Sequence, residues 1–356
     1  MRPWVLVLDP PNGDAARRVA GLTLALRLAL DAQAGKATAV VVGPGVARSL
    51  FDDPRLGIPV LDAPPPGAAL VRVPASFVVH RQLFKTLAET TEADARDLAG
   101  APFPLDLPWS FEPIDVIDDA SARRAERALF RALRKPQDGW TSRWLNRYVS
   151  LAISRVLIRT PLRPNQVSVG ILAVGLLGAW LASRGGYLPV AVGAFLFQMQ
   201  SILDGCDGEM SRVSYRGSLA GEWLDTVGDD LTNYGFFAGA AWGLHAATGQ
   251  SLYLLAGAVT VACGLLASGI EYRYLIRIGS GDLLKYPIAG ESETSQGLFA
   301  KIQPLFKRDT FVFVTFLAAL AGALGPMLIL FSLGGIGIVI GVLKAELRMA
   351  RERRAS

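Results

Sequence analysis

The sequence contains few cysteines and histidines. Of its 356 residues two are cysteine, Cys206 and Cys263, and two are histidine. Two cysteines allow at most one disulfide, which excludes a disulfide-stapled fold and a cysteine metal site. We therefore expect a chain that faces a reducing compartment.

Charge is also scarce. Charged residues make up 19% of the chain, hydrophobic residues make up 51%, and the mean hydropathy is +0.34. The charges crowd into the first half and a few loops, leaving almost uncharged stretches of about 20 residues, long enough to span a bilayer. The net charge of +5 does not indicate nucleic acid, because the basic residues flank apolar runs instead of mixing with aromatic residues on a soluble face. The composition predicts an integral membrane protein that does not bind nucleic acid.

Residues 1–138 are predicted to form a cytosolic α/β domain. Short β-like runs alternate with helical patterns, which is typical of a mainly parallel sheet. The runs lie at residues 4–8, 38–42, 69–73 and 114–117, and the helical patterns at 14–34, 76–87 and 119–134, the last capped by Asp118 or Asp119. No secretory signal core precedes them, so we expect this half to stay in the cytosol.

Residues 139–163 form a predicted linker. Apolar and arginine side chains alternate at helical spacing over residues 141–159, which indicates an amphipathic helix on the cytosolic membrane surface. A soluble helix packed on the first domain is the alternative. Pro161 and Pro164 then interrupt the chain, and Asn165 is expected to cap the next helix.

Residues 164–356 are predicted to form a domain of six transmembrane helices. The spans lie at residues 166–183, 187–210, 217–244, 251–275, 310–324 and 326–345. Arg184 is the one basic residue in the loops assigned to the outside, whereas the inner loops and the C-terminal tail are rich in Lys and Arg. This asymmetry predicts that both termini lie on the cytoplasmic side of the membrane. For a bacterial or archaeal chain that membrane would be the cytoplasmic (inner) one.

The second and third spans contain carboxylates, which are costly at membrane depth. Two stripes follow the helical period, one made of Asp204, Asp207 and Ser211 and the other of Gly217, Gly221, Asp225, Asp229 and Asn233. If these helices pack antiparallel, four carboxylates converge near the cytosolic surface and require a cation. All-oxygen ligands favour Mg²⁺ or Mn²⁺ and a diphosphate-containing substrate. The alternative is a cation-binding transporter or membrane scaffold in which the carboxylates pair with Arg212 and Arg216.

The same residues form a spaced motif. The array Asp204-x2-Asp207-Gly208-x2-Ser211-Arg212-x8-Gly221-x3-Asp225-x3-Asp229 resembles the signature of the CDP-alcohol phosphotransferase family, Asp-x2-Asp-Gly-x2-Ala-Arg-x8-Gly-x3-Asp-x3-Asp. Seven of the eight fixed positions match, and Ser211 replaces the family's alanine. This small-for-small change leaves the expected pocket open.

The resemblance implies a six-helix membrane domain, often homodimeric, that transfers a substituted phosphate from a CDP-linked donor to an alcohol and releases CMP. By position, Asp204, Asp207 and Asp225 would hold Mg²⁺ or Mn²⁺. Asp229 would complete this acidic set and act as general base on the acceptor hydroxyl. The implied CDP site contains Gly208, Ser211, Arg212 and Gly221, with Asn165 beside the nucleotide. The donor would be of the CDP-diacylglycerol or CDP-inositol class, and the acceptors would include inositol phosphate, in phospholipid or inositol-phosphodiester synthesis.

The whole arrangement is similar to that of bifunctional inositol-1-phosphate cytidylyltransferase/di-myo-inositol-phosphate-phosphate synthases. The junction Arg134-Lys135-Pro136-x-Asp138-Gly139-x2-Ser142-Arg143-x2-Asn146-Arg147 adds to the resemblance. Residues 9–18, however, contain one glycine and two prolines, a poor phosphate-binding loop. We expect a degenerate nucleotidyltransferase-like domain with a regulatory, dimerising or substrate-presenting role. An active cytidylyltransferase is the alternative.

Two further expectations concern basic residues beside the long inner loop. Lys285, Lys307 and Arg308 are candidates for binding an acceptor phosphate, although charges that flank spans also serve as topology signals. Asp309 directly follows Arg308, and the two are expected to form a local ion pair.

Overall fold

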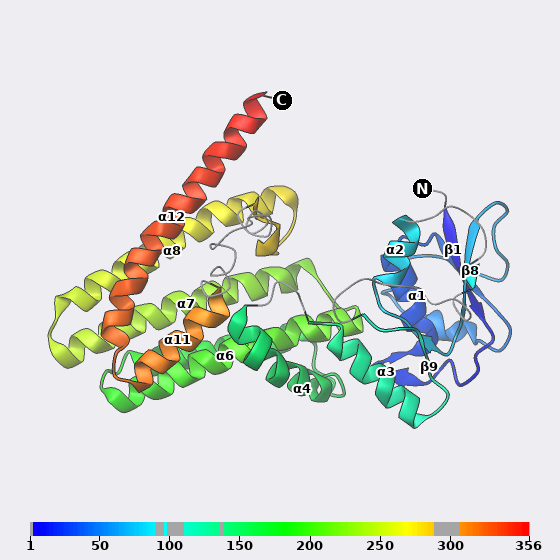
Figure 1. Ribbon diagram of the computed structural model, residues 1–356, viewed down its shortest axis with the longest axis horizontal. Coiled ribbons are helices and arrows are strands. Elements are labelled where there is room, and N and C mark those ends of the chain that lie inside the picture. Colours follow the sequence, from blue (N-terminus) through cyan, green and yellow to red (C-terminus); the bar gives the residue numbers. More distant parts are fainter. Residues whose placement is uncertain (1–2, 90–95, 98–109, 135–138, 288–306, 356) are drawn as a thin grey trace. The chain divides into compact units, whose positions relative to one another are not determined.

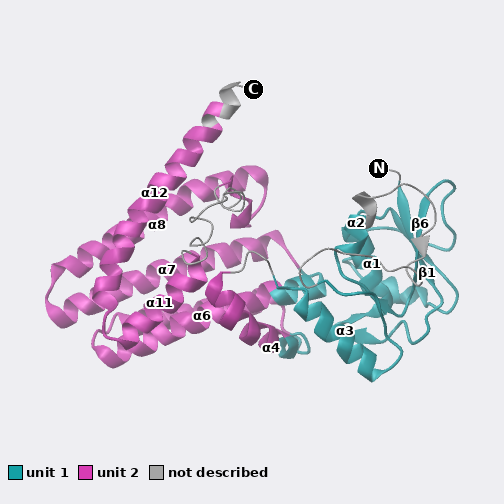
Figure 2. Cartoon of the chain, viewed as in Figure 1, with its two compact units in different colours: residues 1–136, 155–161, 209–216 teal, residues 137–154, 162–208, 217–356 magenta. Residues whose placement is uncertain are grey.

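The computed structural model describes residues 3–89, 96–97, 110–134, 139–287 and 307–355 (Figure 1). Lys135, Pro136 and Asp138 of the junction motif lie outside these residues. The chain forms two compact units (Figure 2). Unit 1 contains residues 1–136, 155–161 and 209–216, and unit 2 contains residues 137–154, 162–208 and 217–356.

Unit 1 contains a five-stranded sheet whose order is β5-β4-β1-β6-β8. In that order the strands are Val60–Leu61, Ala39–Val42, Trp4–Asp9, Ala69–Pro74 and Arg96–Asp97, and each neighbouring pair is parallel. Leu6 lies opposite Val40 on one side and Val71 on the other. All three side chains are buried, as expected for central parallel strands that read as continuous apolar runs.

Helices α1 (Leu24–Ala34), α2 (Leu83–Glu89) and α3 (Asp119–Arg131) complete unit 1, with a 3₁₀ turn at Arg48–Phe51. Asp118 caps α3 as predicted, since its carboxylate accepts the backbone N–H of Ser121 at 2.7 Å. The main core of the unit lies between the sheet and α1, where Leu8, Leu28 and Phe84 are fully buried.

Two predicted helices in unit 1 are shorter than expected. The pattern at 14–34 predicted one helix, but β2 (Arg18–Val19) and β3 (Leu22–Thr23) form an antiparallel hairpin before α1 begins. The hairpin turns at Ala20 and Gly21, whose φ angles of 47° and 83° interrupt a helix.

The pattern at 76–87 also contains a strand. Strand β7 (Phe77–Val78) pairs antiparallel with β9 (Ile114–Asp115), and α2 begins only at Leu83. The pairing partner is distant in the chain, so local periodicity did not reveal this strand.

Unit 2 is helical. It contains a π-helical turn (Ser142–Asn146) and most of α4 (Arg147–Leu157), followed by long helices: α5 (Pro164–Ala182), α6 (Tyr187–Ser214), α7 (Leu219–Thr248), α8 (Ser251–Ile278), α11 (Arg308–Leu320) and α12 (Leu324–Ala355). Helix α6 ends in unit 1, because its last turns belong to residues 209–216. Each predicted span therefore corresponds to one helix.

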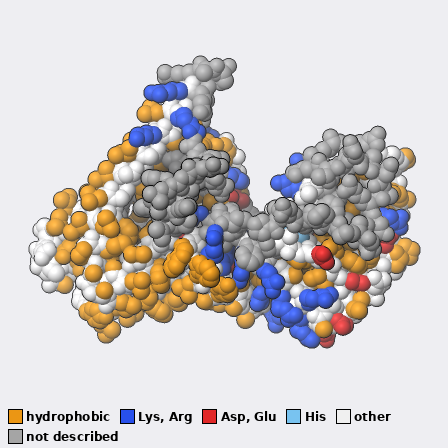
Figure 3. All heavy atoms as spheres, in the orientation of Figure 1, with side chains coloured by type: hydrophobic (Ala, Val, Ile, Leu, Met, Phe, Trp, Pro, Cys, Tyr) orange, Lys and Arg blue, Asp and Glu red, His pale blue; other side chains and the backbone are white. Residues whose placement is uncertain are grey.

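Four of the described helices, α5, α6, α8 and Leu324–Met349 of α12, are long and apolar enough to cross a membrane. Large apolar side chains such as Trp180, Leu188 and Leu333 are more than half exposed, and hydrophobic side chains gather on the face of unit 2 that is seen in Figure 3. By length and composition this is an integral membrane protein. Helix α7 contains Glu222 and two of the motif aspartates, Asp225 and Asp229, and α11 has 13 residues, so a count of six spans stays a prediction.

Candidate active site

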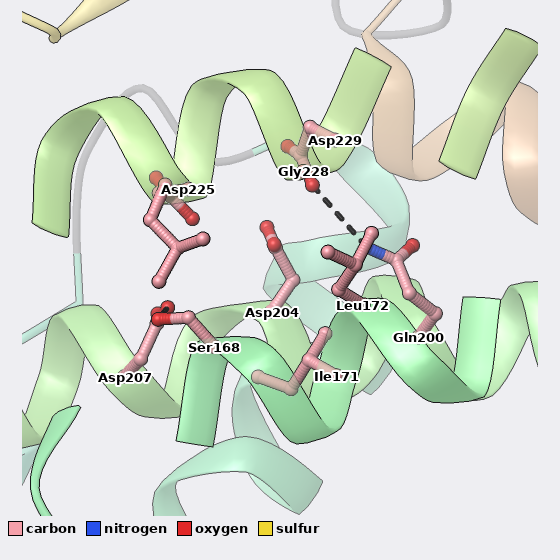
Figure 4. Close-up of a pocket in the computed structure, with 10 residues that line it drawn as sticks. Ser168, Ile171, Leu172, Gln200, Asp204, Asp207, Asp225, Gly228 and Asp229 are labelled. Carbon is pink, nitrogen blue, oxygen red and sulfur yellow. Dashed lines mark hydrogen bonds between the residues drawn. The ribbon is translucent and has the colours of Figure 1, made fainter. Parts of the chain in front are cut away.

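One pocket in unit 2, with about 210 Å³ of open space, is lined by the carboxylates of the motif (Figure 4). Asp204 and Asp207 come from α6, and Asp225 and Asp229 from α7. Helical steps of three and four residues put each pair on one face, and the two faces meet as the spacing predicted. The remaining lining residues are Ser168, Ile171, Leu172, Gln200, Leu224 and Gly228.

Two uncharged side chains hold carboxylates in this pocket. Ser168 on α5 donates its hydroxyl to Asp207, and both side chains are buried. The Gln200 amide nitrogen donates to Oδ1 of Asp229 at 3.2 Å, and Gln200 is itself only 1% exposed. Two of the four carboxylates are therefore held by neutral donors from other helices.

A positive charge lies among the same carboxylates. The Nη1 atom of Arg308, at the first residue of α11, lies 2.7 Å from Asp229 and 3.2 Å from Asp204. Its Nη2 atom donates to the Oε1 atom of Gln200 at 2.8 Å, which also fixes the orientation of that amide. The guanidinium thus offsets part of the repulsion between Asp204 and Asp229.

The expected local pair between Arg308 and Asp309 is wrong. Arg308 turns toward α6 and α7, whereas Asp309 accepts the backbone N–H of Ser142 at 2.5 Å. Neighbouring residues at a helix N-terminus point in different directions around the axis, so each finds its own partner.

The predicted cap at Asn165 is also wrong. Helix α5 begins at Pro164, and Arg163 occupies the N-cap position with its N–H donating to the Gln166 side chain at 2.9 Å. Proline is favoured at the first helical position, which places Asn165 inside the helix. Its side chain lies beside Gly221, where an added Cβ would come within 2.9 Å of Asn165 Oδ1. Two predicted nucleotide-site residues are therefore adjacent.

The other predicted nucleotide residues lie along α6. The Gly208 N–H donates to Oδ1 of Asp207 at 2.5 Å. Ser211 and Arg212 lie in the last turn of α6. Their assignment to a CDP site stays a prediction.

Three residues of this site were missed by the sequence analysis. Ser168, Gln200 and Gly228 line the pocket, yet none belongs to the spaced motif. Gln200 carried the strongest available signal, since it is a polar residue in an otherwise apolar run. Gly228 leaves open space, because a Cβ added there would meet no atom within 4 Å.

Comparison with known proteins identifies relatives over part of the chain. A bifunctional IPC transferase and DIPP synthase from Rubrobacter xylanophilus is 38% identical over 180 residues, covering 49% of this chain and 38% of the relative. The synthase of that name from Aquifex aeolicus is 36% identical over 171 residues, covering 46% of this chain and 39% of the relative. The one from Archaeoglobus fulgidus is 37% identical over 126 residues, covering 35% and 25%. The resemblance to bifunctional synthases of this kind is confirmed over the matched part of the chain.

The extent of these matches is limited. The matched part of the chain spans less than two fifths of the length of these synthases, and no family model matches it. Among solved structures, Mycobacterium tuberculosis phosphatidylinositol phosphate synthase with CDP-DAG bound has a TM-score of 0.42 at 18% identity, covering 56% of this chain and 93% of that chain.

Enzymes of the CDP-alcohol phosphotransferase family generally depend on a divalent metal. Within the residues that the structure describes, no three His, Cys, Asp or Glu side chains are grouped closely enough to hold an ion. The donor chemistry of the pocket nevertheless fits a hard cation, because its four acidic side chains offer oxygen ligands only.

Proposed function

We propose that this protein is a membrane-embedded transferase that moves a substituted phosphate from a CDP-linked donor to an alcohol and releases CMP. The observation that carries the proposal is the convergence of four motif carboxylates on one pocket lined by residues of α5, α6 and α7 (Figure 4). The names of the relatives, IPC transferase and DIPP synthase, support inositol-containing substrates. A phospholipid product is the other outcome that the substrate panel below distinguishes.

Asp229 would act as the general base in this reaction. It accepts the proton of the acceptor hydroxyl as the hydroxyl oxygen attacks phosphorus, and the bond between that phosphorus and the CMP oxygen breaks. Gln200 holds one carboxylate oxygen of Asp229, and Arg308 supplies positive charge beside the other. A fixed base close to the attacking oxygen lowers the barrier to proton transfer.

The remaining carboxylates would hold Mg²⁺ or Mn²⁺. Asp204, Asp207 and Asp225, with Asp229 at the edge of the set, provide oxygen donors from two helices. When bound, such an ion spreads the charge that develops on the phosphate oxygens. Ser168 would keep Asp207 in place through its hydrogen bond.

We place the nucleotide against the start of α7. The proximity of Asn165 to Gly221 supports this position, because a glycine lets a ligand approach the backbone beside an amide side chain. Gly208, Ser211 and Arg212 would complete the CDP site along α6, with the Arg212 charge opposite phosphate. By its charge distribution and family resemblance, the site would open to the cytoplasm in a homodimer with both termini on that side.

Unit 1 would not transfer nucleotides. Polar groups at the end of β1 and just after it are engaged within the unit, since Asp9 pairs with Arg72 at 2.5 Å and the Asn12 amide donates to Asp115 at 2.7 Å. Arg17, one of the two arginines in residues 9–18, pairs with Asp119 at 2.5 Å. A bifunctional enzyme that also makes CDP-inositol is the alternative, and it predicts CTP-dependent diphosphate release by the full chain.

The test is CMP release by the purified protein in nanodiscs with Mg²⁺ or Mn²⁺. CDP-diacylglycerol and CDP-inositol are each combined with inositol phosphate, glycerol phosphate or serine. We expect acceptor-dependent CMP release from one donor, which names both substrates. If the protein showed no CDP binding and no turnover with any pair, that result would contradict the proposal and favour a transporter or scaffold.

A further inference from the structure

The C-terminal end of α6 is closed by an unusual turn. After Ser214 the chain passes through Tyr215, whose φ of 54° is in the left-handed region that bulky residues seldom adopt. The Arg216 N–H then donates to the Ser211 carbonyl at 3.1 Å, as in a helix end of the Schellman type. Glycine is the usual residue at the position of Tyr215, so other contacts have to hold this turn.

Two arginines of unit 1 donate to the last carbonyls of the same helix. Arg27 Nη1, from α1, lies 3.1 Å from the Val213 oxygen, and Arg55 Nη1 lies 2.6 Å from the Ser214 oxygen. The final carbonyls of a helix have no partner within the helix, and a positive charge beside them is favoured by the helix dipole. Arg27 and Arg55 therefore cap α6 by hydrogen bonding and by charge.

Both arginines are fixed before they reach α6. Arg27 is 2% exposed, and its Nη2 atom donates to the Val19 and Ala20 carbonyls at 2.9 and 3.2 Å. Arg55 forms two hydrogen bonds to the Asp53 carboxylate, at 2.7 and 2.6 Å. Their donors are thus held in position by unit 1, and little side-chain freedom remains to be lost on capping.

Tyr215 anchors the turn from the other side. Its hydroxyl donates to Asp31 on α1. Its ring packs against an apolar cluster made of Leu22, Leu26, Leu30 and Leu56. These contacts explain how a tyrosine is kept at a position that glycine usually occupies.

We propose that unit 1 is a clamp for the C-terminal end of α6, with Arg27 and Arg55 as positioning residues for the CDP donor. The clamp and the motif share one helix, because Ser211 and Arg212 lie in the turn whose carbonyls are capped. Holding this turn in place therefore also fixes the positions of the Ser211 and Arg212 side chains. The effect on the donor rests on the proposed function, whereas the clamp itself rests on the contacts alone.

The test combines hydrogen exchange with kinetics on the full chain in nanodiscs. The main variant is Arg55→Gln, because Arg55 is partly exposed and its loss leaves the buried Arg27 in place. Arg48→Gln is the matched control. Like Arg55, Arg48 pairs with an aspartate (Asp62) and donates to a backbone carbonyl (Val60), but neither partner belongs to α6. Arg55→Lys tests rescue, because it keeps a charged donor.

In Arg55→Gln we expect amides of residues 209–216 to exchange about 10-fold faster than in the wild type. We also expect the KM for the CDP donor to rise about 10-fold while kcat changes less than about 2-fold. Arg48→Gln leaves both quantities unchanged, and Arg55→Lys recovers part of both. Unchanged exchange at 209–216 would overturn the clamp.

Faster exchange with an unchanged KM would overturn the positioning of the donor. A wild type without turnover would contradict the proposed function instead, and the exchange measurement would still decide whether the clamp exists. Arg27→Lys, a milder change at the buried position, is expected to raise exchange over the same residues, and an unchanged pattern there would count against the clamp as well.

Discussion

Arg308 Nη1 lies 2.7 Å from Oδ2 of Asp229, although the two residues belong to different helices. The guanidinium also reaches Asp204 at 3.2 Å. A residue outside the spaced motif therefore supplies positive charge to its first and last aspartates. Gln200 connects the two partners, because it accepts from Arg308 and donates to Asp229.

Removing this charge is expected to weaken the folded state. In Arg308→Gln, Asp204 and Asp229 lose a shared partner. We therefore expect the free energy of unfolding to fall by about 1–3 kcal/mol. This loss is smaller than for a fully buried pair, because the three side chains are about one quarter exposed. Thermal unfolding in detergent measures this. We also expect added Mg²⁺ to raise the melting temperature more in the variant than in the wild type.

Arg308→Lys is the control for charge alone. It keeps the positive charge but loses the planar fork that reaches both carboxylates and Gln200, so its loss of stability should be smaller. Equal melting temperatures for wild type and Arg308→Gln would show that the ion pairs contribute nothing measurable.

Gly221→Ala tests the nucleotide site. The new Cβ would come within 2.9 Å of Asn165 Oδ1 and 3.2 Å of Ser218 Oγ, so the Asn165 amide must move. We expect the KM for the CDP donor to rise about 10-fold with a smaller change in kcat. Gly269→Ala on α8 is the control, because a Cβ there meets nothing within 4 Å. An unchanged donor KM in Gly221→Ala would remove Gly221 and Asn165 from the site.

The convergence of the motif aspartates could be predicted because it depends on helical periodicity. Asp225 and Asp229 are four residues apart and must share a face once α7 forms, and the short connection at 215–218 brings α7 back along α6. The positions of the long apolar helices could also be predicted, because nearly uncharged stretches of about 20 residues are long enough to span a bilayer. The number of these helices that cross the membrane does not follow from hydropathy alone, since α7 is rich in acidic residues.

The partners of these aspartates could not be predicted. Ser168 and Arg308 reach the pocket from α5 and α11, and Gln200 reaches Asp229 from α6. Such contacts depend on how helices pack rather than on spacing along one of them. The failed cap at Asn165 has a local cause, because Pro164 takes the first helical position and moves the cap to Arg163. The hairpin before α1 was hidden by apolar residues that also suit a helix.

The stability of unit 1 should depend on pH through Asp31. Burial raises the pKa of Asp31 to about 6, although the hydrogen bond from Tyr215 and the charges of Arg27 and Arg81 act in the opposite direction. The folded chain then binds a proton that the unfolded chain has released at pH 4–6. The stability contributed by this group is present below about pH 4 and is lost as pH rises through about 6.

Comparison with Asp31→Asn isolates this effect, because the amide of the variant does not titrate. The other titrating groups are common to both proteins. One of them is Asp53, whose pKa is lowered by its hydrogen bonds from Arg55. Between pH 4 and 7 the wild type should lose up to roughly 3 kcal/mol relative to the variant. Melting temperatures of both proteins across this range provide the measurement. Parallel pH profiles would contradict the assignment.

The central claim is that Asp229 takes the proton of the acceptor hydroxyl, and the rate of CMP release by Asp229→Asn tests it most directly. The adjacent Asp230→Asn is the matched control, because the Asp230 carboxylate accepts from the Tyr272 hydroxyl at 2.6 Å and does not line the pocket. We predict that kcat falls about 10²- to 10⁴-fold in Asp229→Asn while donor binding is largely kept, and that Asp230→Asn stays within about 5-fold of the wild type. A wild-type rate in Asp229→Asn would contradict the account.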